Sequence, residues 1–383
     1  MPFYHQLGKI PPKRHTVFRQ ENGQLHREHV VGSQGFSGPQ SILYHVHPPT
    51  RVLRTAAIHE VAPQANTESA LKMRHFQLAG LPHARSTTFD RTPLLFNADV
   101  ALWMVRPTAT DEFFYRNAQA DEIVFVAEGE GVLESQMGEL PYREGDYVVV
   151  PCGILHRFRV EGDTRLLIIE SAGMVRTPRR YRNEFGQLLE HSPYCERDIR
   201  RPQMLPVHDE PGEFRLLVKR QDVLTEVVLD HHPLDVVGWD GYYYPWALSI
   251  HDFEPITGSL HQPPPVHQTF QGDGFVVCSF VPRLFDYHEE AVPAPYAHSN
   301  VNSDEVLFYA NDEFMSRKGV GYGSLTLHPG GLPHGPHPGR AEASIGKQRT
   351  DELAVMLDTF RPLKVARDAL DLEDPDYERS WLE

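Results

Sequence analysis

Short runs of β-branched and aromatic residues, closed by a proline, set the hydrophobic pattern of the chain. Residues 146–151 and 275–282 are two such runs, and short runs of this composition are typical of β-strands. Apolar residues with the period of a helix are scarce, and the best helix candidates are residues 65–71, 181–189 and 364–370. The pattern therefore predicts an all-β protein with few short helices.

A segment rich in charge and proline interrupts this pattern. It covers residues 176–211 and is typical of an irregular connection between two halves. The length agrees, because 383 residues exceed the usual size of one domain. We expect an N-terminal domain over residues 1–210 and a C-terminal domain over residues 211–383.

Charge and cysteine content narrow the range of partners. Lys and Arg total 37 against 52 Asp and Glu, a net charge of −15. A surface with this negative charge repels phosphate backbones and anionic lipids. We therefore expect no nucleic-acid and no membrane partner. The scattered Cys152, Cys195 and Cys278 form no disulfide framework and suit a reducing compartment. Without a signal-peptide pattern or a membrane-length apolar run, the chain is expected to be cytoplasmic.

An internal repeat relates the two halves. Residues 115–125 align without a gap on residues 298–308, so that an Asn, an Asp-Glu pair and the strand after them coincide. The motif Pro-x-Gly-x-x-His occurs at residues 151–156 and again at 329–334. The offsets are 183 residues (298 − 115) and 178 residues (329 − 151), so one loop differs by five residues. Each half is expected to contain the same supersecondary unit.

That unit combines a strand, a hairpin and a Pro-x-Gly-x-x-His turn, and it resembles the cupin double-stranded β-helix, a small jelly-roll barrel. The resemblance implies a bicupin with two jelly-roll barrels. Ligands on adjacent strands of such a barrel point into its mouth, which allows residues far apart in the sequence to converge.

We expect a metal site in the second copy of the repeat, where the residues that point into the barrel are His298, Glu305 and His334. Two imidazoles and one carboxylate leave coordination positions open, which favours Fe(2+) and oxygen chemistry, with manganese, nickel and zinc as alternatives. Asp304 competes with Glu305, and His328 competes with His334. The ungapped repeat favours Glu305 and the Pro-x-Gly-x-x-His motif favours His334, which leaves His328 beside the ligands or in contact with a substrate.

The first copy differs at one position of this set. Tyr115 stands where the second copy has His298, although Glu122 and His156 are present. Because the loss of one imidazole removes much of the metal affinity, we expect a degenerate site in the N-terminal domain.

The chain as a whole resembles the homogentisate 1,2-dioxygenase family. The motifs that carry this resemblance are residues 35–41, 235–241, 295–300, 323–328 and 332–336. They span most of the chain and are most specific in its C-terminal half. The resemblance implies an enzyme that opens the aromatic ring of homogentisate with O2 and forms maleylacetoacetate.

The resemblance also implies a cofactor, site residues and an assembly. It assigns Fe(2+) to the three ligand positions already named and makes His261 the catalytic base toward the substrate phenol. Tyr296, His328 and His334 match positions in contact with the substrate. The family also assembles through trimers, which implies a homo-oligomer.

One departure from the family concerns the carboxylate ligand. Residues 299–305 read Ser-Asn-Val-Asn-Ser-Asp-Glu, and on the family's spacing the glutamate falls on Asp304. This spacing disagrees with the internal repeat, which selects Glu305, so the two carboxylates remain alternatives.

The sequence leaves the substrate open within one chemical class. Arg317 and Lys318 are candidates for binding a substrate carboxylate by sequence proximity alone. The alternatives to homogentisate are another hydroquinone acid such as gentisate, or a bicupin that binds a small molecule without turnover.

Overall fold

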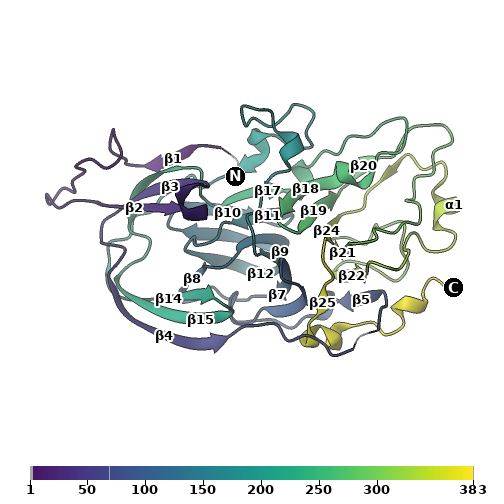
Figure 1. Cartoon of the computed structure of the whole chain (residues 1–383), viewed down its shortest axis with the longest axis horizontal. Coiled ribbons are helices and arrows are strands. Elements are labelled where there is room, and N and C mark those ends of the chain that lie inside the picture. Colours follow the sequence, from purple (N-terminus) through teal and green to yellow (C-terminus); the bar gives the residue numbers. More distant parts are fainter. Residues whose placement is uncertain (1–2, 69, 383) are drawn as a thin grey trace.

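The computed structural model describes residues 3–68 and 70–382, and its regular secondary structure is almost entirely β-strand, joined by long loops (Figure 1). Among these residues the single α-helix is α1, Arg340–Ser344. The remaining helical turns are of the 3-10 type: η1 Gln34–Phe36, η2 Leu78–Gly80, η3 Arg179–Tyr181, η4 Glu196–Asp198, η5 Ile250–Asp252, η6 Pro264–His267, η7 Arg367–Leu372 and η8 Tyr377–Arg379. The all-β prediction is confirmed. No helix within the described residues could cross a lipid bilayer.

The predicted strands formed and the predicted helices largely did not. Residues 146–150 form β11 and residues 275–280 form β19. Of the expected helix 65–71, residue 69 lies outside the described residues and the others are not helical. Only the first residue of 181–189 is in a 3-10 turn, η3. The third candidate, 364–370, begins as strand β25 and continues into η7. Pairing of β25 with β6 overrides a weak local helical pattern there.

The first barrel is built from a 13-stranded sheet whose long central strands are β9 (Asp121–Ser135) and β12 (His156–Ser171). The other strands of this sheet are β4 Val52–Glu60, β6 Thr92–Phe96, β7 Val100–Val105, β8 Phe114–Asn117, β10 Gly138–Arg143, β11 Asp146–Val150, β13 Ile199–Arg200, β14 Pro211–Arg220, β15 Val223–His231, β17 Trp246–Ser249 and β25 Lys364–Val365.

The second barrel is built around a six-stranded sheet in the order β18-β19-β24-β21-β22-β5. Its strands are β18 Gln268–Gly272, β19 Phe275–Phe280, β24 Ala354–Thr359, β21 Asp304–Tyr309, β22 Ser324–His328 and β5 Arg74–Gln77. A four-stranded and a two-stranded sheet complete the fold, with strands β1 His5–Gly8, β16 Val236–Gly241, β3 Gln40–His45 and β2 Arg27–Gly32, and β20 Arg283–Leu284 with β23 Arg349–Thr350.

The internal repeat is visible in the backbone. Tyr115 on β8 pairs with His156 at the start of β12, and His298 forms the equivalent bridge with His334. The next strand along the chain is β9 after Tyr115 and β21 after His298. The predicted bicupin fold is thus present, with equivalent residues converging in each half.

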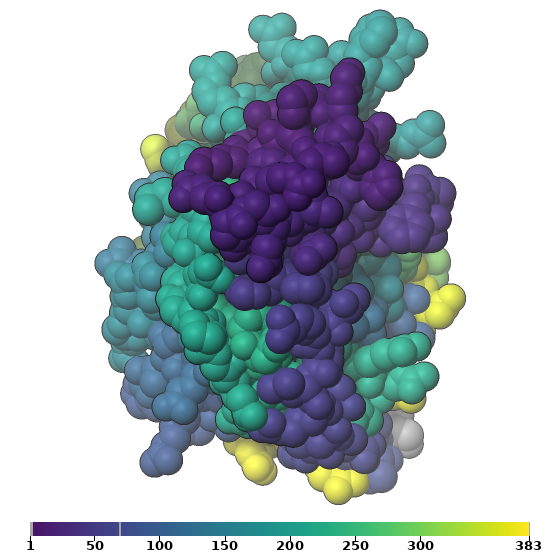
Figure 2. Space-filling model, turned by 90° about the vertical axis from the view of Figure 1, so that its left-hand side faces the viewer, coloured from purple at the N-terminus to yellow at the C-terminus, as the bar shows by residue number. Residues whose placement is uncertain are grey.

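The strands do not separate between the two sheets at residue 210. Strands β14 and β15 follow residue 210 but hydrogen-bond to β8 and β4 of the first sheet, and β5 precedes it but pairs with β22 of the second. Figure 2 shows the end of the molecule where the N-terminal residues, in purple, lie beside green residues from this later part of the chain. The two domain ranges stay a prediction.

A continuous hydrophobic core joins the halves. It includes Phe125 of β9 and Phe308 of β21, whose ring centroids lie 6.1 Å apart. Between the sheets the hydroxyl of Tyr147 hydrogen-bonds to that of Ser279 over 2.9 Å. This shared core holds the second sheet, and therefore the site described next, against the first barrel.

Candidate metal centre

Three of the predicted site residues meet in the second barrel: His298, Glu305 and His334. Their nearest nitrogen and oxygen atoms all lie within 4.8 Å of one another. The Nε2 atom of His298 lies 3.6 Å from Oε2 of Glu305, and the Nε2 atom of His334 lies 3.4 Å from the same oxygen. Two nitrogens and one oxygen therefore face a common point.

Backbone pairing explains the convergence. His298 and His334 exchange two backbone hydrogen bonds, of 2.8 and 2.9 Å, which fixes their side chains next to each other. Glu305 projects from β21, whose neighbours β22 and β24 hold it on both sides. Residues 36 positions apart along the chain (334 − 298) are joined by these bonds in one rigid unit.

The hydrogen bonds leave the facing nitrogens free to bind a metal. The Nδ1–H of His298 donates to the carbonyl oxygen of Tyr296 over 3.0 Å, so its Nε2 carries a lone pair. His334 is 4% exposed, and neither of its ring nitrogens has a hydrogen-bond partner among the described residues. A buried polar atom without a partner is rare in proteins. A divalent transition metal bound to these two nitrogens and the carboxylate would satisfy it.

The electrostatics agree with an ionised carboxylate at this point. Burial alone would raise the pKa of Glu305, but contacts with the histidines around it hold that pKa well below its usual range. The carboxylate of Glu305 conversely raises the pKa of His298, against the opposing effect of burial. The cluster is thus polarised, with a negative oxygen between imidazole rings.

His328 lies behind the carboxylate of Glu305, away from the cavity. It is fully buried and, among the described residues, is absent from the walls of the cavity beside the site. Its Nδ1–H donates to Oε1 of Glu305 over 2.8 Å, and its Nε2 accepts from the hydroxyl of Tyr377 over 3.2 Å. The resemblance gave His328 to the substrate pocket; the alternative, a residue beside the ligands, matches the structure. Tyr377 was not expected, because it lies in the polar C-terminal segment.

Of the two candidate carboxylates, only Glu305 faces the histidines. Successive side chains on a strand point to opposite faces of the sheet. Asp304 points away, and its two oxygens accept the backbone N–H of Gly330 over 2.8 Å and of Leu363 over 2.7 Å. Its equivalent in the first barrel, Asp121, is bonded in the same way to Cys152 and Val175, at 2.8 Å each. The Asp of the repeated pair therefore ties loops to the barrel.

A cavity of about 480 Å³ opens beside the cluster and is lined by His298 and Glu305. The predicted His261 and Tyr296 line it too, with ring centroids 5.1 Å apart. His261 is half exposed, and its Nδ1 lies 3.3 Å from Oδ2 of Asp286. His334, which the resemblance also gave to the substrate, is not part of the cavity wall among the described residues.

Two residues of the cavity wall, Arg180 and Asp358, were not candidates in the sequence analysis. A third, Arg317, was a candidate by sequence proximity alone. Arg180 reaches the wall from the segment read as a connection. Asp358 lies opposite Glu305 in the strand register, and burial followed by the charge of Glu305 raises its pKa to about 7. Arg317 is buried, with an Nη2 atom 3.9 Å from Oε1 of Glu305. Glu170 has the same register position relative to Glu122 in the first barrel, an equivalence that lies outside the two stretches of the sequence repeat.

In the first barrel an arginine stands against the equivalent carboxylate. The guanidinium of Arg91 binds both oxygens of Glu122, at 2.8 and 3.2 Å, and both side chains are buried. The hydroxyl of Tyr115 adds a third bond of 3.3 Å to the same carboxylate. The carboxylate that a metal would need is therefore engaged by an internal cation.

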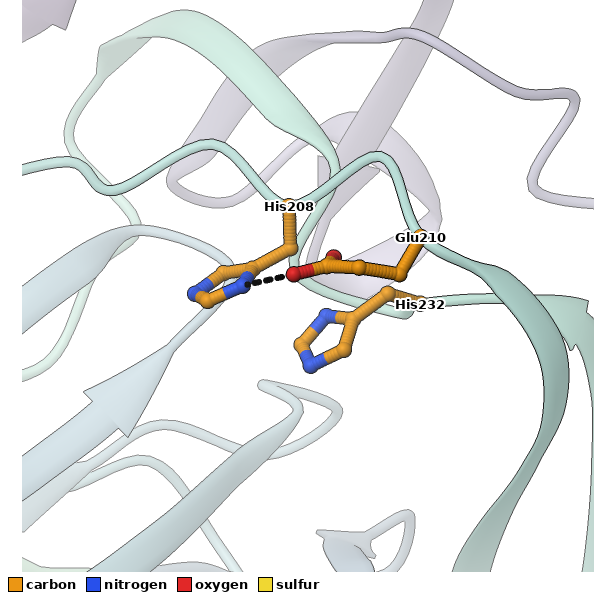
Figure 3. Close-up of side chains that lie close together, drawn as sticks. All are labelled: His208, Glu210 and His232. Atoms are coloured by element: carbon orange, nitrogen blue, oxygen red, sulfur yellow. Dashed lines mark hydrogen bonds and ion pairs between the residues drawn. The ribbon is translucent and has the colours of Figure 1, made fainter.

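A second cluster of histidines and a carboxylate is drawn in Figure 3 and consists of His208, Glu210 and His232. The imidazole rings of His208 and His232 are stacked 4.2 Å apart at 23°, so their lone pairs lie in nearly parallel planes. The Nδ1 of His232 also accepts the backbone N–H of Leu234 over 3.1 Å. Stacked rings with an engaged nitrogen are a poor metal site, and we assign no metal to this cluster.

Comparison with known proteins gives two kinds of relative. A family model described as a cupin domain matches residues 101–171, which run from β7 to the end of β12. The chain is 44% identical over 389 residues to a "Putative dioxygenase" of Saccharolobus solfataricus, an alignment that covers 100% of this chain and 99% of the relative. It is also 26% identical over 414 residues to the homogentisate 1,2-dioxygenase of Nitrobacter hamburgensis, covering 98% of this chain and 90% of that enzyme.

Proposed function

Since the chain belongs to the same family as the Saccharolobus solfataricus "Putative dioxygenase", we propose that it is an Fe(2+)-dependent dioxygenase that opens the aromatic ring of homogentisate with O2 to give maleylacetoacetate. The observation that carries this proposal is the His298, Glu305 and His334 set beside a cavity of about 480 Å³. The more distant similarity to a homogentisate 1,2-dioxygenase supports the choice of substrate.

The ligand set suits a redox metal with room for substrates. His298, Glu305 and His334 would hold Fe(2+) through two nitrogens and one oxygen, the 2-His-1-carboxylate set typical of non-haem iron oxygenases. When bound, Fe(2+) supplies open coordination positions and the electrons that activate O2. The chain itself supplies the fixed ligand geometry, because backbone bonds and the His328–Glu305 contact hold the side chains in place.

His261 is the residue that we propose to take a proton from the ring hydroxyl of the substrate. It lines the same cavity as His298 and Glu305. An imidazole is a suitable base near neutral pH. The carboxylate of Asp286 lies 3.3 Å from its Nδ1, which favours a proton on Nδ1 and leaves Nε2 as the proton acceptor.

Apolar wall residues complete the site by excluding water from the reacting ring. Leu307, Phe314 and Met356 line the cavity together with Phe280. An aromatic ring of hydroquinone size fits such a wall, and restricted positioning next to the ligand set favours reaction.

Oxygen consumption tests the proposal directly. Full-length protein loaded anaerobically with Fe(2+) is mixed with homogentisate or gentisate, and air is then admitted while oxygen uptake and ultraviolet absorbance are followed. We expect uptake with homogentisate, none with the His334→Ala variant, and normal uptake with a variant at an exposed histidine, His191→Ala.

The other outcomes separate the alternatives. Faster uptake with gentisate would keep the chemistry and change the substrate. No uptake with either hydroquinone acid, in protein shown to contain iron, would overturn the enzyme proposal in favour of a bicupin that binds a small molecule without turnover.

A further inference from the structure

The cavity beside the metal centre contains three arginines in its wall, and they differ in their partners. Arg283 forms an ion pair of 2.8 Å with Glu352. Arg317 faces the metal-site carboxylate of Glu305, at 3.9 Å, and bonds to the carbonyl oxygen of Gly335. Each of these two cations is balanced by an acid of the same wall.

Among the described residues, the hydrogen-bond partners of Arg180 are all neutral groups. Its guanidinium donates to the side-chain oxygen of Gln268, to the carbonyl oxygen of Pro265 over 2.6 Å and to the hydroxyl of Tyr181 over 3.2 Å. Within the described residues no carboxylate oxygen lies within 4.0 Å of it. A positive charge is therefore held at the cavity without an acidic partner.

The bonds to Gln268 and Pro265 also fix where that charge stands. Both residues line the cavity, and they belong to β18 and η6 of the second barrel. An arginine has five N–H donors in a planar fork, and the three printed bonds leave donors for a ligand. A guanidinium already oriented by its neighbours binds a carboxylate with little further loss of side-chain freedom.

We infer that Arg180 binds the carboxylate of the substrate and makes the cavity selective for aromatic acids over neutral phenols. This inference rests on the proposed function, which is the reason to expect a hydroquinone ring in the cavity. Arg180 belongs to the segment between the halves, so this segment contributes a residue to the cavity of the second barrel.

A binding experiment without turnover tests this. Homogentisate and methylhydroquinone, a neutral hydroquinone without the acid arm, are titrated by calorimetry into the Fe(2+)-loaded protein in the absence of oxygen. Wild type is expected to prefer the acid. Arg180→Gln should weaken homogentisate binding roughly 10- to 100-fold, the usual effect of losing hydrogen bonds to a charged group, and leave methylhydroquinone binding unchanged. Arg180→Lys should recover part of the preference.

The neighbouring Arg179 offers a matched control. Like Arg180 it is exposed on the same 3-10 turn, but among the described residues it does not line the cavity. Arg179→Gln is expected to keep the wild-type preference. In steady state, Arg180→Gln should raise KM for homogentisate with little change in kcat. Thermal unfolding of each variant, expected to match wild type, checks that the fold is kept.

Oxygen uptake measured in parallel separates this inference from the proposed function. Loss of acid preference in Arg180→Gln supports the inference even if no uptake occurs, and then the function alone fails. Unchanged preference in Arg180→Gln overturns the inference even if uptake is normal, because the anion then binds elsewhere. Failure of wild type to bind either hydroquinone overturns both.

Discussion

At the scale of single residues, the adjacent acids of β21 have different tasks. Glu305→Gln removes the negative charge that faces His298 and His334, so we expect loss of iron binding and of activity. The two carboxylate oxygens of Asp304 each accept one backbone N–H group. Asp304→Asn replaces one of these oxygens with an NH2 group, which cannot accept. We therefore expect it to keep the iron and to lower the free energy of unfolding by about 1–3 kcal/mol. Metal analysis after dialysis and urea unfolding measure the two effects.

The opposite pattern would identify the other ligand. If Asp304→Asn released the iron and Glu305→Gln retained it, the family's spacing would be the better guide to this chain. The position could not be decided from the sequence, because two rules disagreed by one residue. In the folded chain strand alternation turns Glu305 toward the histidines and Asp304 away from them, which favours Glu305.

The tyrosine behind His328 gives a second prediction at this scale. Tyr377→Phe removes the O–H that donates to Nε2 of His328 and so loosens the imidazole that orients Glu305. Partners of this kind commonly change metal affinity by about 10- to 100-fold. We expect a loss of iron affinity in that range, measured by competition with a chelator. The exposed Tyr287→Phe is the control, and an equal loss in both variants would refute the role.

At the scale of elements, the repeat carried most of what the sequence could predict. The bridges Tyr115–His156 and His298–His334 occur at equivalent places because the motif spacings encode the same turn. Helix predictions failed where strands from elsewhere supplied a partner, as for β25 beside β6. Such long-range pairing leaves no local signal in the sequence. The same holds for the contact of Arg91 with Glu122, which lies 31 residues later in the chain.

That arginine gives a prediction about the first barrel. Burial would raise the pKa of Glu122, but the charge of Arg91 keeps it below its usual range. Arg91→Met would leave this carboxylate buried without a cation, at a cost of about 3–5 kcal/mol in the free energy of unfolding. The double variant with Glu122→Gln should recover much of that loss. Urea unfolding of the four members of this cycle measures it.

An exposed ion pair serves as the reference for this cycle. Arg54 and Glu213 lie 2.8 Å apart on the surface of the first sheet, both more than half exposed. Arg54→Met should change the free energy of unfolding far less than Arg91→Met does, because solvent screens an exposed ion pair. A similarly small effect of Arg91→Met would mean that Glu122 is stabilised in another way, and the first barrel would again be a candidate for metal binding.

At the scale of the whole molecule, acid should destabilise the fold through buried neutral histidines. Burial, followed by the charge of Arg283, lowers the pKa of His267 to about 3. Burial, followed by a neighbouring histidine, lowers that of His29 and of His232 to about 4. The unfolded chain takes up these protons near pH 6.5 and the folded chain does not. Their contribution to stability is therefore complete above about pH 6.5 and is lost as the pH falls toward 4.

Two buried carboxyls act in the opposite direction, so only a difference between variants isolates the effect. Burial raises the pKa of Asp121 to about 6 and that of Asp358 to about 7. These acids bind protons more readily in the folded chain, which favours folding in acid. His267→Asn should therefore be compared with wild type by urea unfolding at several pH values. The slope of stability against pH between 6 and 4 should fall by up to about 1.4 kcal/mol per pH unit, the value for one proton.

The buried setting of His267 makes the outcome informative for the whole fold. Its ring lies against Phe280 of β19, with centroids 4.6 Å apart, and its Nδ1 has no hydrogen-bond partner among the described residues. Protonation therefore requires either water to enter the cavity wall or the sheet to open. An exposed histidine, His191→Asn, should leave the slope unchanged. If His267→Asn also left it unchanged, His267 would take up protons in the folded state, which would mean that water reaches the cavity beside the metal centre.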